Sequence, residues 1–498
     1  MPETPTELRP ETDRAEDPDI SAALPSAAVA AAAGAPTRAE LRRKTDRDIV
    51  RLAWPAIISQ VLASAVSLID IAMLGRLGTD ALAAVGYTSQ YFQLAQAALL
   101  ALSVACVALM ARALGAGEPD RARGAFAASL VLSLGSAVAI CVIAVGFPRF
   151  LLGALNADPG VIDVAVPYFQ LTLGSTLLLA ASLTVESAYR SARNTTTPLV
   201  IASVVTVVKL ALNGLLIFGA FGFPELDLIG AGIATLAAQV VGVALFVACA
   251  RRPGRPETSA VRLRPADFRR VREFLPETAR VSWPALGERV LLNSALLIYF
   301  WVLSDYGPVA IAAYTIGVRL LSFSWIPGVG ISIAASTLVG QALGAGDARL
   351  AARAGWRSAR LALLVSLVLF VVFALLRRTL AEGFTDDAEV IAALIPFMLL
   401  LGIAQPFLGV HFTLAGALRG AGDTVTPLWS ATLGNWVFRV PLALLVAKVF
   451  HMDVVWVWGT VVFDHVTRAI WLTWAFRREK WAQNLGAGLS RPGSGAAH

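Results

Sequence analysis

Twelve long apolar runs constrain the fold of this chain more than any other feature. A helix rises about 1.5 Å per residue, so roughly 20 residues cross the hydrocarbon of a bilayer. The mean hydropathy is +0.69, and charged residues make up 15% of the chain, below the roughly 25% of soluble proteins. The runs cover approximately residues 52–74, 83–110, 126–147, 161–187, 198–220, 229–250, 282–303, 312–340, 355–377, 390–416, 427–449 and 453–476. The sequence therefore predicts an all-α membrane protein with twelve transmembrane helices.

The two halves of the chain repeat each other at a shift of 229 residues (283 − 54). Trp-Pro at 54–55 recurs at 283–284, Leu-Gly-Ala-Gly at 114–117 recurs at 343–346, and the polar loop 190–199 aligns with 419–428. Each half holds six runs, an even number, so both copies have the same orientation in the membrane. We therefore predict two six-helix lobes related by an internal parallel repeat, as in transporters built from two bundles.

The basic residues predict the orientation. With both termini in the cytoplasm, the cytoplasmic segments hold 27 Lys and Arg and the opposite loops hold 5, which is the bias of multi-pass proteins in a cell (inner) membrane. Composition then predicts the domains: a disordered cytoplasmic tail at 1–45, an N-lobe at 46–250, a basic cytoplasmic linker at 251–280, a C-lobe at 281–482 and a disordered tail at 483–498.

Asp70 is the single acid in the first apolar run. A carboxylate inside hydrocarbon is costly, which makes Asp70 a candidate functional residue. It lies roughly 27 Å along its helix from the cytoplasmic start. Its repeat counterpart is Tyr299 (70 + 229), so the repeat does not require an acid here. Such a carboxyl can accept a proton from outside and release it inside; the alternative is that it only bonds neighbouring helices.

Lys209 and Asn213 lie one turn apart on the same face of the fifth predicted helix. Lys209 sits roughly 17 Å into that helix, so its long side chain can extend towards Asp70. We hypothesise that Lys209 and Asp70 form an intramembrane pair whose protonation changes with substrate. The alternative is that Lys209 offsets the acid for structural reasons alone.

Over roughly residues 46–482, these features resemble the multidrug and toxic compound extrusion (MATE) transporters. The shared features are a Pro at the start of helices 1 and 7, Leu-Gly-Ala-Gly after helices 2 and 8, and Arg-Gly-Ala-Gly-Asp-Thr-Val-Thr-Pro-Leu at 419–428. Asp70, fifteen residues after Pro55 and followed by Leu-Gly-Arg-Leu-Gly, is most similar to the DinF-like branch. The NorM-type branch has an acid deep in helix 7, where this chain has only Glu288, near the cytoplasmic end.

The resemblance implies export of organic, often cationic or amphipathic, compounds by alternating access, driven by inward flow of protons or sodium ions. It implies no cofactor besides that gradient. The family usually has Asn and Asp where this chain has Lys209 and Asn213. A lysine in place of a neutral ligand disfavours bound sodium, so we predict proton coupling through Asp70, Lys209 and Asn213.

Nine further polar residues are candidates for lining a substrate cleft. Each has a structural alternative: amides commonly join helices, an arginine can snorkel, and a buried histidine is more often a packing residue. The candidates are Gln60, Tyr87, Gln93, Gln96, Asn293, Tyr299, Arg319, His411 and Arg439. Arg439 lies one residue from the repeat copy of Lys209, position 438. Asp464 and Arg468 are four residues apart and are expected to pair on one helix face.

No P-loop, HExxH, GxSxG or CxxC pattern occurs in the sequence, so we predict a transporter and not an enzyme. The three cysteines lie in apolar runs without metal-like spacing, and we expect no metal. The expected partners are small organic substrates and membrane lipids, with no nucleic acid, and the expected state is a monomer.

Two alternative functions stay open. One is a flippase for lipid-linked precursors, which needs a strongly basic cavity. The other is an integral-membrane lipid-modifying enzyme, which needs clustered His and acids.

Overall fold

The computed structural model describes residues 38–222, 224–252 and 260–483. The C-terminal tail expected at 483–498 lies outside this part except for its first residue, as does most of the N-terminal tail expected at 1–45. Residues 38–45, the end of that segment, are helical and begin α2. Two compact units divide at Asp46 and Arg47, and the description below concerns the larger unit, which begins at Arg47.

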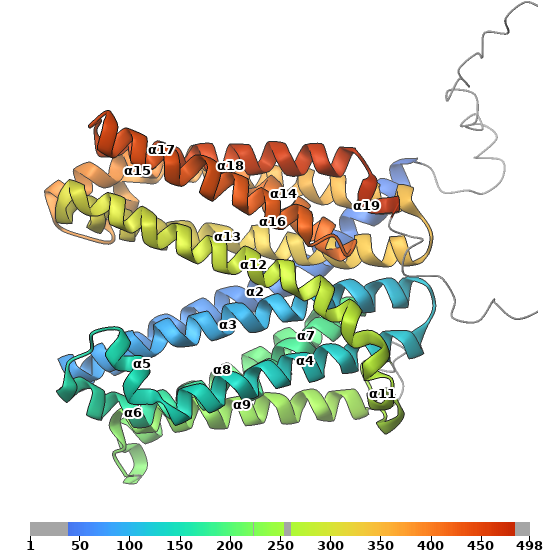
Figure 1. The fold of residues 1–498 in the computed structure, drawn as a ribbon, viewed down its shortest axis with the longest axis horizontal. Helices are drawn as coiled ribbons and strands as arrows, with labels where there is room; N and C mark the ends of the chain where they lie inside the picture. Colours follow the sequence, from blue (N-terminus) through green and yellow to red (C-terminus); the bar gives the residue numbers. More distant parts are fainter. Residues whose placement is uncertain (1–37, 223, 253–259, 484–498) are drawn as a thin grey trace, which may run out of the picture. The chain divides into compact units, whose positions relative to one another are not determined.

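The first half of the chain forms one group of helices, drawn from blue to green in Figure 1. Polar or proline-containing turns separate these helices, and Pro119, Pro148 and Pro159 each stand in the first turn of a helix, where a missing N–H is tolerated. The elements are α2 (Arg38–Leu74), α3 (Thr79–Gly115), α4 (Pro119–Gly146), α5 (Pro148–Ala154), α6 (Pro159–Gly174), α7 (Thr176–Ser191), α8 (Thr196–Ile217) and α9 (Asp227–Arg251).

Most of the second half forms a second group, drawn from yellow to red in Figure 1, but its first short helix, α11 (Pro265–Arg269), lies against α4 of the first group. One of its membrane-spanning segments consists of α16, α17 and two π-helical stretches. The elements are α11 (Pro265–Arg269), α12 (Val271–Leu303), α13 (Gly307–Gly344), α14 (Ala348–Glu382), α15 (Ala388–Gly420), α16 (Val425–Ala431), η4 (Thr432–Arg439), α17 (Val440–Leu444), η5 (Leu445–Val449), α18 (Val454–Arg477) and α19 (Lys480–Gln483).

The prediction of twelve spans in two lobes is confirmed. Ten continuous helical stretches of the described residues are long and apolar enough to cross a membrane. One of them, 271–344, contains α12 and α13 and supplies two crossings. α18 is not among these ten stretches, but it is a helix of 24 residues and supplies the remaining crossing. α6 and α7 together form one span, 159–191. No strand occurs in the part of the chain that the structure describes.

Several helices extend beyond the apolar runs that predicted them. α12 begins at Val271, inside the segment 251–280 expected to be a linker, and its Pro276 and Pro284 lie within the helix. Pro55 likewise lies inside α2 and does not open it. The apolar runs mark only the length in contact with hydrocarbon, and a helix can continue into water with polar residues. Linker residues 253–259 lie outside the described part.

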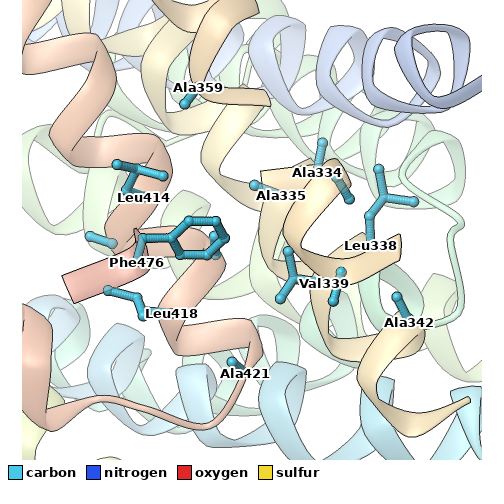
Figure 2. Close-up of a cluster of buried hydrophobic side chains, with 14 of the residues drawn as sticks. Ala334, Ala335, Leu338, Val339, Ala342, Ala359, Leu414, Leu418, Ala421 and Phe476 are labelled. Atoms are coloured by element: carbon cyan, nitrogen blue, oxygen red, sulfur yellow. The ribbon is translucent and has the colours of Figure 1, made fainter. Parts of the chain in front are cut away.

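Small residues set the packing of the second lobe. Ala334, Ala335 and Ala359 are at most 4% exposed, and their short side chains let the backbones of α13, α14 and α15 approach closely. Figure 2 shows these residues in a buried cluster with Leu338, Val339, Leu414, Leu418 and Phe476. Ile49, Leu52 and Ala53 of α2 belong to the same cluster. The first helix of one lobe therefore packs partly on the other lobe.

The two lobes meet at a pair of repeat-related contacts. A Cβ atom on Gly115, at the end of α3, would lie 2.0 Å from the carbonyl oxygen of Gln341, and one on Gly344, at the end of α13, would lie 1.9 Å from that of Arg112. Positions 115 and 344 are 229 residues apart, as are 112 and 341. The contact therefore obeys the two-fold symmetry of the repeat, and we call this end of the lobes the closed end.

Candidate functional site

Asp70 is bound by both predicted partners from α8. Lys209 Nζ forms an ion pair and a hydrogen bond with Asp70 Oδ2. Asn213 Nδ2 donates a hydrogen bond to Asp70 Oδ1 at 2.8 Å. Lys209 and Asn213 are one turn apart on α8, which lets both reach the two oxygens of one carboxylate. The hypothesised contact between Lys209 and Asp70 is present; its role in coupling stays a prediction.

Asp70, Lys209 and Asn213 form a cluster that is partly buried but still accessible to solvent. The side chains of Asp70 and Lys209 are 18% and 21% exposed, whereas Asn213 is 1% exposed. The ammonium of Lys209 offsets the negative charge of the Asp70 carboxylate. The Asp70 carboxylate is therefore paired with a cation and is still partly accessible to solvent.

One buried acceptor in the cluster has no partner. Asn213 Oδ1 forms no hydrogen bond with any residue that the structure describes. Because an amide has a donor and an acceptor on one planar group, rotation of the amide would present this oxygen to Asp70. Asn213 can thus donate to an ionised Asp70 and accept from a protonated one.

The second lobe also has a cation at the position that corresponds to Asp70, but the residue it contacts there is a tyrosine and not an acid. Tyr299, the counterpart of Asp70, lies under the guanidinium of Arg439, whose central carbon is 4.2 Å from the ring centroid. The π-helix Thr432–Arg439 precedes this side chain. A π-helix bonds i to i+5 and so inserts a residue relative to an α-helix, which accounts for the offset of Arg439 from position 438. Each lobe therefore sets a cation against the residue at this position, but only the first lobe has an acid there.

Three of the cleft candidates are buried in the second lobe, and a role for them in a substrate cleft stays a prediction. Tyr299 is 0%, His411 2% and Arg439 8% exposed. The Tyr299 hydroxyl donates to the carbonyl of Val457 at 2.8 Å, and the ring of His411 stacks on that of His465 with centroids 5.2 Å apart. Each of these helices is rotated about its own axis so that these side chains point into the lobe. The spacing of residues in the sequence does not predict that rotation.

Charged neighbours in the second lobe pair differently from expectation. Asp464 Oδ2 lies 3.9 Å from Arg439 Nη1, and this is the ion pair that the structure shows for Asp464, in place of the expected one with Arg468. Glu288 is held by Arg419, whose Nη2 donates to its two carboxylate oxygens at 2.6 and 2.8 Å. Glu288 thereby joins α12 to the end of α15.

The remaining candidates are accessible to different degrees. Gln60, Gln93, Asn293 and Arg319 are exposed, and Tyr87 and Gln96 are partly buried. Asn293 lines a pocket of about 240 Å³ between α12 and helices α3 to α6 of the first lobe. Arg289, one turn before Asn293, lines the same pocket. Arg289 is not among the nine predicted cleft residues, although an arginine within an apolar run is a sufficient signal for a functional site.

The closed end is joined by side chains as well as by close backbones. Gln341 Nε2 donates to the carbonyl of Ser191 at 2.6 Å, and its Oε1 accepts from Arg193 Nε. Thr337 Oγ1 donates to the carbonyl of Arg190 at 3.2 Å. These bonds connect α13 of the second lobe with the end of α7 in the first.

Among the residues that the structure describes, no group of three or more His, Cys, Asp or Glu is placed to hold a metal ion.

Comparisons with known proteins agree with this architecture. The chain is 27% identical over 440 residues to the probable multidrug resistance protein NorM of Thermotoga maritima, covering 87% of this chain and 93% of that protein. It is 28% identical over 465 residues to the protein of the same name from Rhodopseudomonas palustris, covering 91% and 96%. These comparisons do not test the DinF-like assignment, which stays a prediction.

Solved structures show the same fold. The bent form of the Vibrio cholerae MATE transporter VcmN superposes with a TM-score of 0.81 at 21% identity, covering 90% of this chain and 99% of that one. A MOP superfamily transporter from Pyrococcus furiosus superposes with a TM-score of 0.80 at 21% identity, covering 89% and 96%. The MatE family model matches twice, at residues 55–215 and 284–445, once in each lobe. The chain therefore belongs to the MatE family of membrane transporters.

Proposed function

We propose that this protein is a secondary active antiporter that exports amphipathic organic compounds in exchange for protons. The observation that carries the proposal is the partly exposed Asp70 bound by Lys209 and Asn213. An acid within a membrane-spanning segment marks an ion pathway more often than a structural site. Relatives named as multidrug resistance proteins over most of their length support the export of organic compounds.

The coupling step follows from the contacts of Asp70. A proton from outside that bonds to Asp70 Oδ1, the oxygen beside Asn213, neutralises the carboxylate and ends its ion pair with Lys209, and Asn213 Oδ1 can then accept the new O–H group. The ammonium of Lys209 is left without its counter-ion, so the contact between α2 and α8 weakens. Release of the proton on the other side restores the pair. Proton occupancy thereby biases the two arrangements of the lobes.

The second lobe supports the choice of Asp70 as the coupling residue. Arg439 and Tyr299 occupy the corresponding positions, and neither a guanidinium nor a phenol exchanges its proton readily near neutral pH.

We also propose an inner-membrane location with both termini cytoplasmic, from the distribution of basic residues. The closed end then faces the cytoplasm, and the structure corresponds to an outward-facing state.

Reconstitution tests this function. Proteoliposomes with an acidic lumen should accumulate a fluorescent amphipathic compound, because protons leaving the lumen drive substrate entry, and an imposed sodium gradient should not. Asp70→Asn should reduce the proton-driven accumulation to the level of protein-free vesicles. Glu288→Gln is the matched control: it neutralises an acid held by an arginine in the other lobe and should keep the coupling.

Two results would contradict the proposal. Proton-driven accumulation that survives in Asp70→Asn would remove Asp70 from the coupling step. Accumulation driven by sodium alone would replace the proton as the coupled ion.

A further inference from the structure

We propose that the pocket between α12 and the first lobe binds small organic anions with an apolar body, and that Arg289 binds their anionic group. This inference rests on the proposed export of amphipathic compounds and specifies the charge of the substrate. It departs from the cationic class that the family resemblance implies.

The pocket is apolar over most of its wall. It has a volume of about 240 Å³, and its lining includes Leu94, Ile140 and Phe169 from the first lobe and Leu286 and Val290 from α12. Such a wall binds the apolar part of a small organic molecule by excluding water. A two-chain phospholipid is far larger than this volume. The pocket therefore suits a compact amphipathic molecule.

Arg289 provides a positive charge in this wall, and the acid that it interacts with electrostatically, Glu288, forms its ion pair with another arginine. Its neighbour Glu288 is held through both carboxylate oxygens by Arg419, and Asp70 is held by Lys209. Among the described residues, the guanidinium of Arg289 has no ion pair or hydrogen bond. An arginine in a membrane-spanning segment ordinarily faces a partner or a water-filled cavity, and here it faces the pocket.

The geometry of a guanidinium selects the ligand. Its N–H groups form a planar fork that matches two oxygens of a carboxylate, sulfonate or phosphate. Asn293, one turn further along α12, adds an amide within the same wall, and its Nδ2 donates to the carbonyl of Arg289 at 3.0 Å. A cationic ligand in this pocket would be repelled by Arg289. The structure assigns the pocket to organic anions on this basis.

Two probes of equal apolar body and opposite charge test the assignment. Radiolabelled naphthalene-2-sulfonate and (naphthalen-2-yl)trimethylammonium are titrated by equilibrium dialysis against the purified full-length protein in detergent. We expect the sulfonate to bind about tenfold or more tightly than the ammonium, as for a charge-assisted hydrogen bond. Arg289→Met should remove this preference, and Arg289→Lys should retain part of it as a point charge.

Arg377→Met is the matched control. Arg377 is also an arginine in a membrane-spanning helix of the second lobe, α14, but its side chain donates to the carbonyl of Ala374 at 3.0 Å and it is not among the residues that line this pocket. We expect its loss to leave sulfonate binding unchanged. Thermal melting curves of all variants in the same detergent establish that they are folded.

Three results would overturn the inference. They are ammonium binding as tight as sulfonate binding, equal loss of sulfonate binding in Arg289→Met and Arg377→Met, and complete displacement of the sulfonate by phosphatidylglycerol, which would make the pocket a lipid site. Proton-driven transport in proteoliposomes is measured separately. If the protein transports a cationic dye under a proton gradient and does not bind the sulfonate, the proposed function stands and this inference fails.

Discussion

At the scale of single residues, the pairing of Asp70 with Lys209 determines whether an acid is tolerated in the first helix. A lone charge in a membrane-spanning segment is costly, and a pair of opposite charges with hydrogen bonds lowers that cost. Asn213 completes the arrangement by satisfying the second carboxylate oxygen. The three residues therefore depend on one another for stability as well as for any role in coupling.

A double-mutant cycle tests this dependence. Lys209→Met leaves the Asp70 carboxylate without its cation and should lower the free energy of unfolding by about 1–3 kcal/mol, below the value for a fully buried pair because both side chains are partly exposed. The double variant Asp70→Asn/Lys209→Met removes both charges and should regain most of that loss. Thermal melting in detergent measures the cycle, with Lys209→Arg as the charge-conserving control. Additive effects of the two substitutions would show that the pair contributes no coupling energy.

At the scale of helices, glycine allows the ends of α3 and α13 to cross at the closed end. The missing side chains of Gly115 and Gly344 bring each helix against a backbone carbonyl of the other. An added Cβ at either position would overlap backbone, which cannot move aside as a flexible side chain can. The contact is therefore sensitive to a single methyl group.

Gly344→Ala should open the closed end. Alanine favours a helix over glycine by about 1 kcal/mol, so any loss of this contact comes from the overlap and not from helix propensity. In a variant whose native cysteines are replaced, Ser191→Cys reports on the closed end, since Ser191 is buried there. Its labelling by a maleimide should rise about fivefold or more, as expected when overpacking costs about 1–3 kcal/mol.

Gly86→Ala is the control for this experiment, because a Cβ at Gly86 of α3 meets nothing within 4 Å. Equal labelling in Gly86→Ala and Gly344→Ala would show that the contact does not keep this end closed.

At the scale of the whole molecule, alternating access requires the closed end to separate. The bonds from Gln341 to Ser191 and Arg193 must break when the lobes change arrangement. Both lobes contribute repeat-related residues to the contact, so the separation can occur by a relative rotation of two rigid bundles.

Cross-linking tests the requirement. A reducible bifunctional thiol reagent applied to Ser191→Cys/Gln341→Cys should stop proton-driven transport, and reduction should restore it, because the link holds the lobes in one arrangement. The two single-cysteine variants control for the loss of the native hydrogen bonds. Undiminished transport by fully cross-linked protein would exclude separation at this end.

The sequence by itself determined the number of spans and the repeat, and it suggested the contact between Asp70 and Lys209 only as a hypothesis, which the structure then showed. These follow from quantities that are linear along the chain: the length of an apolar run, the shift between copies, and the depth of a residue at about 1.5 Å per position. Asp70 and Lys209 could be placed near each other because both depths are measured from the same side of the membrane.

The tertiary structure alone decided which way side chains face and which distant residues meet. Tyr299, His411 and Arg439 face the interior of the second lobe, Glu288 meets Arg419, and Arg289 faces a pocket formed with the first lobe. These outcomes depend on the rotation of each helix about its own axis and on the packing of small residues between lobes. A pattern of apolar residues leaves that rotation open in a membrane, because lipid and protein interior are both apolar.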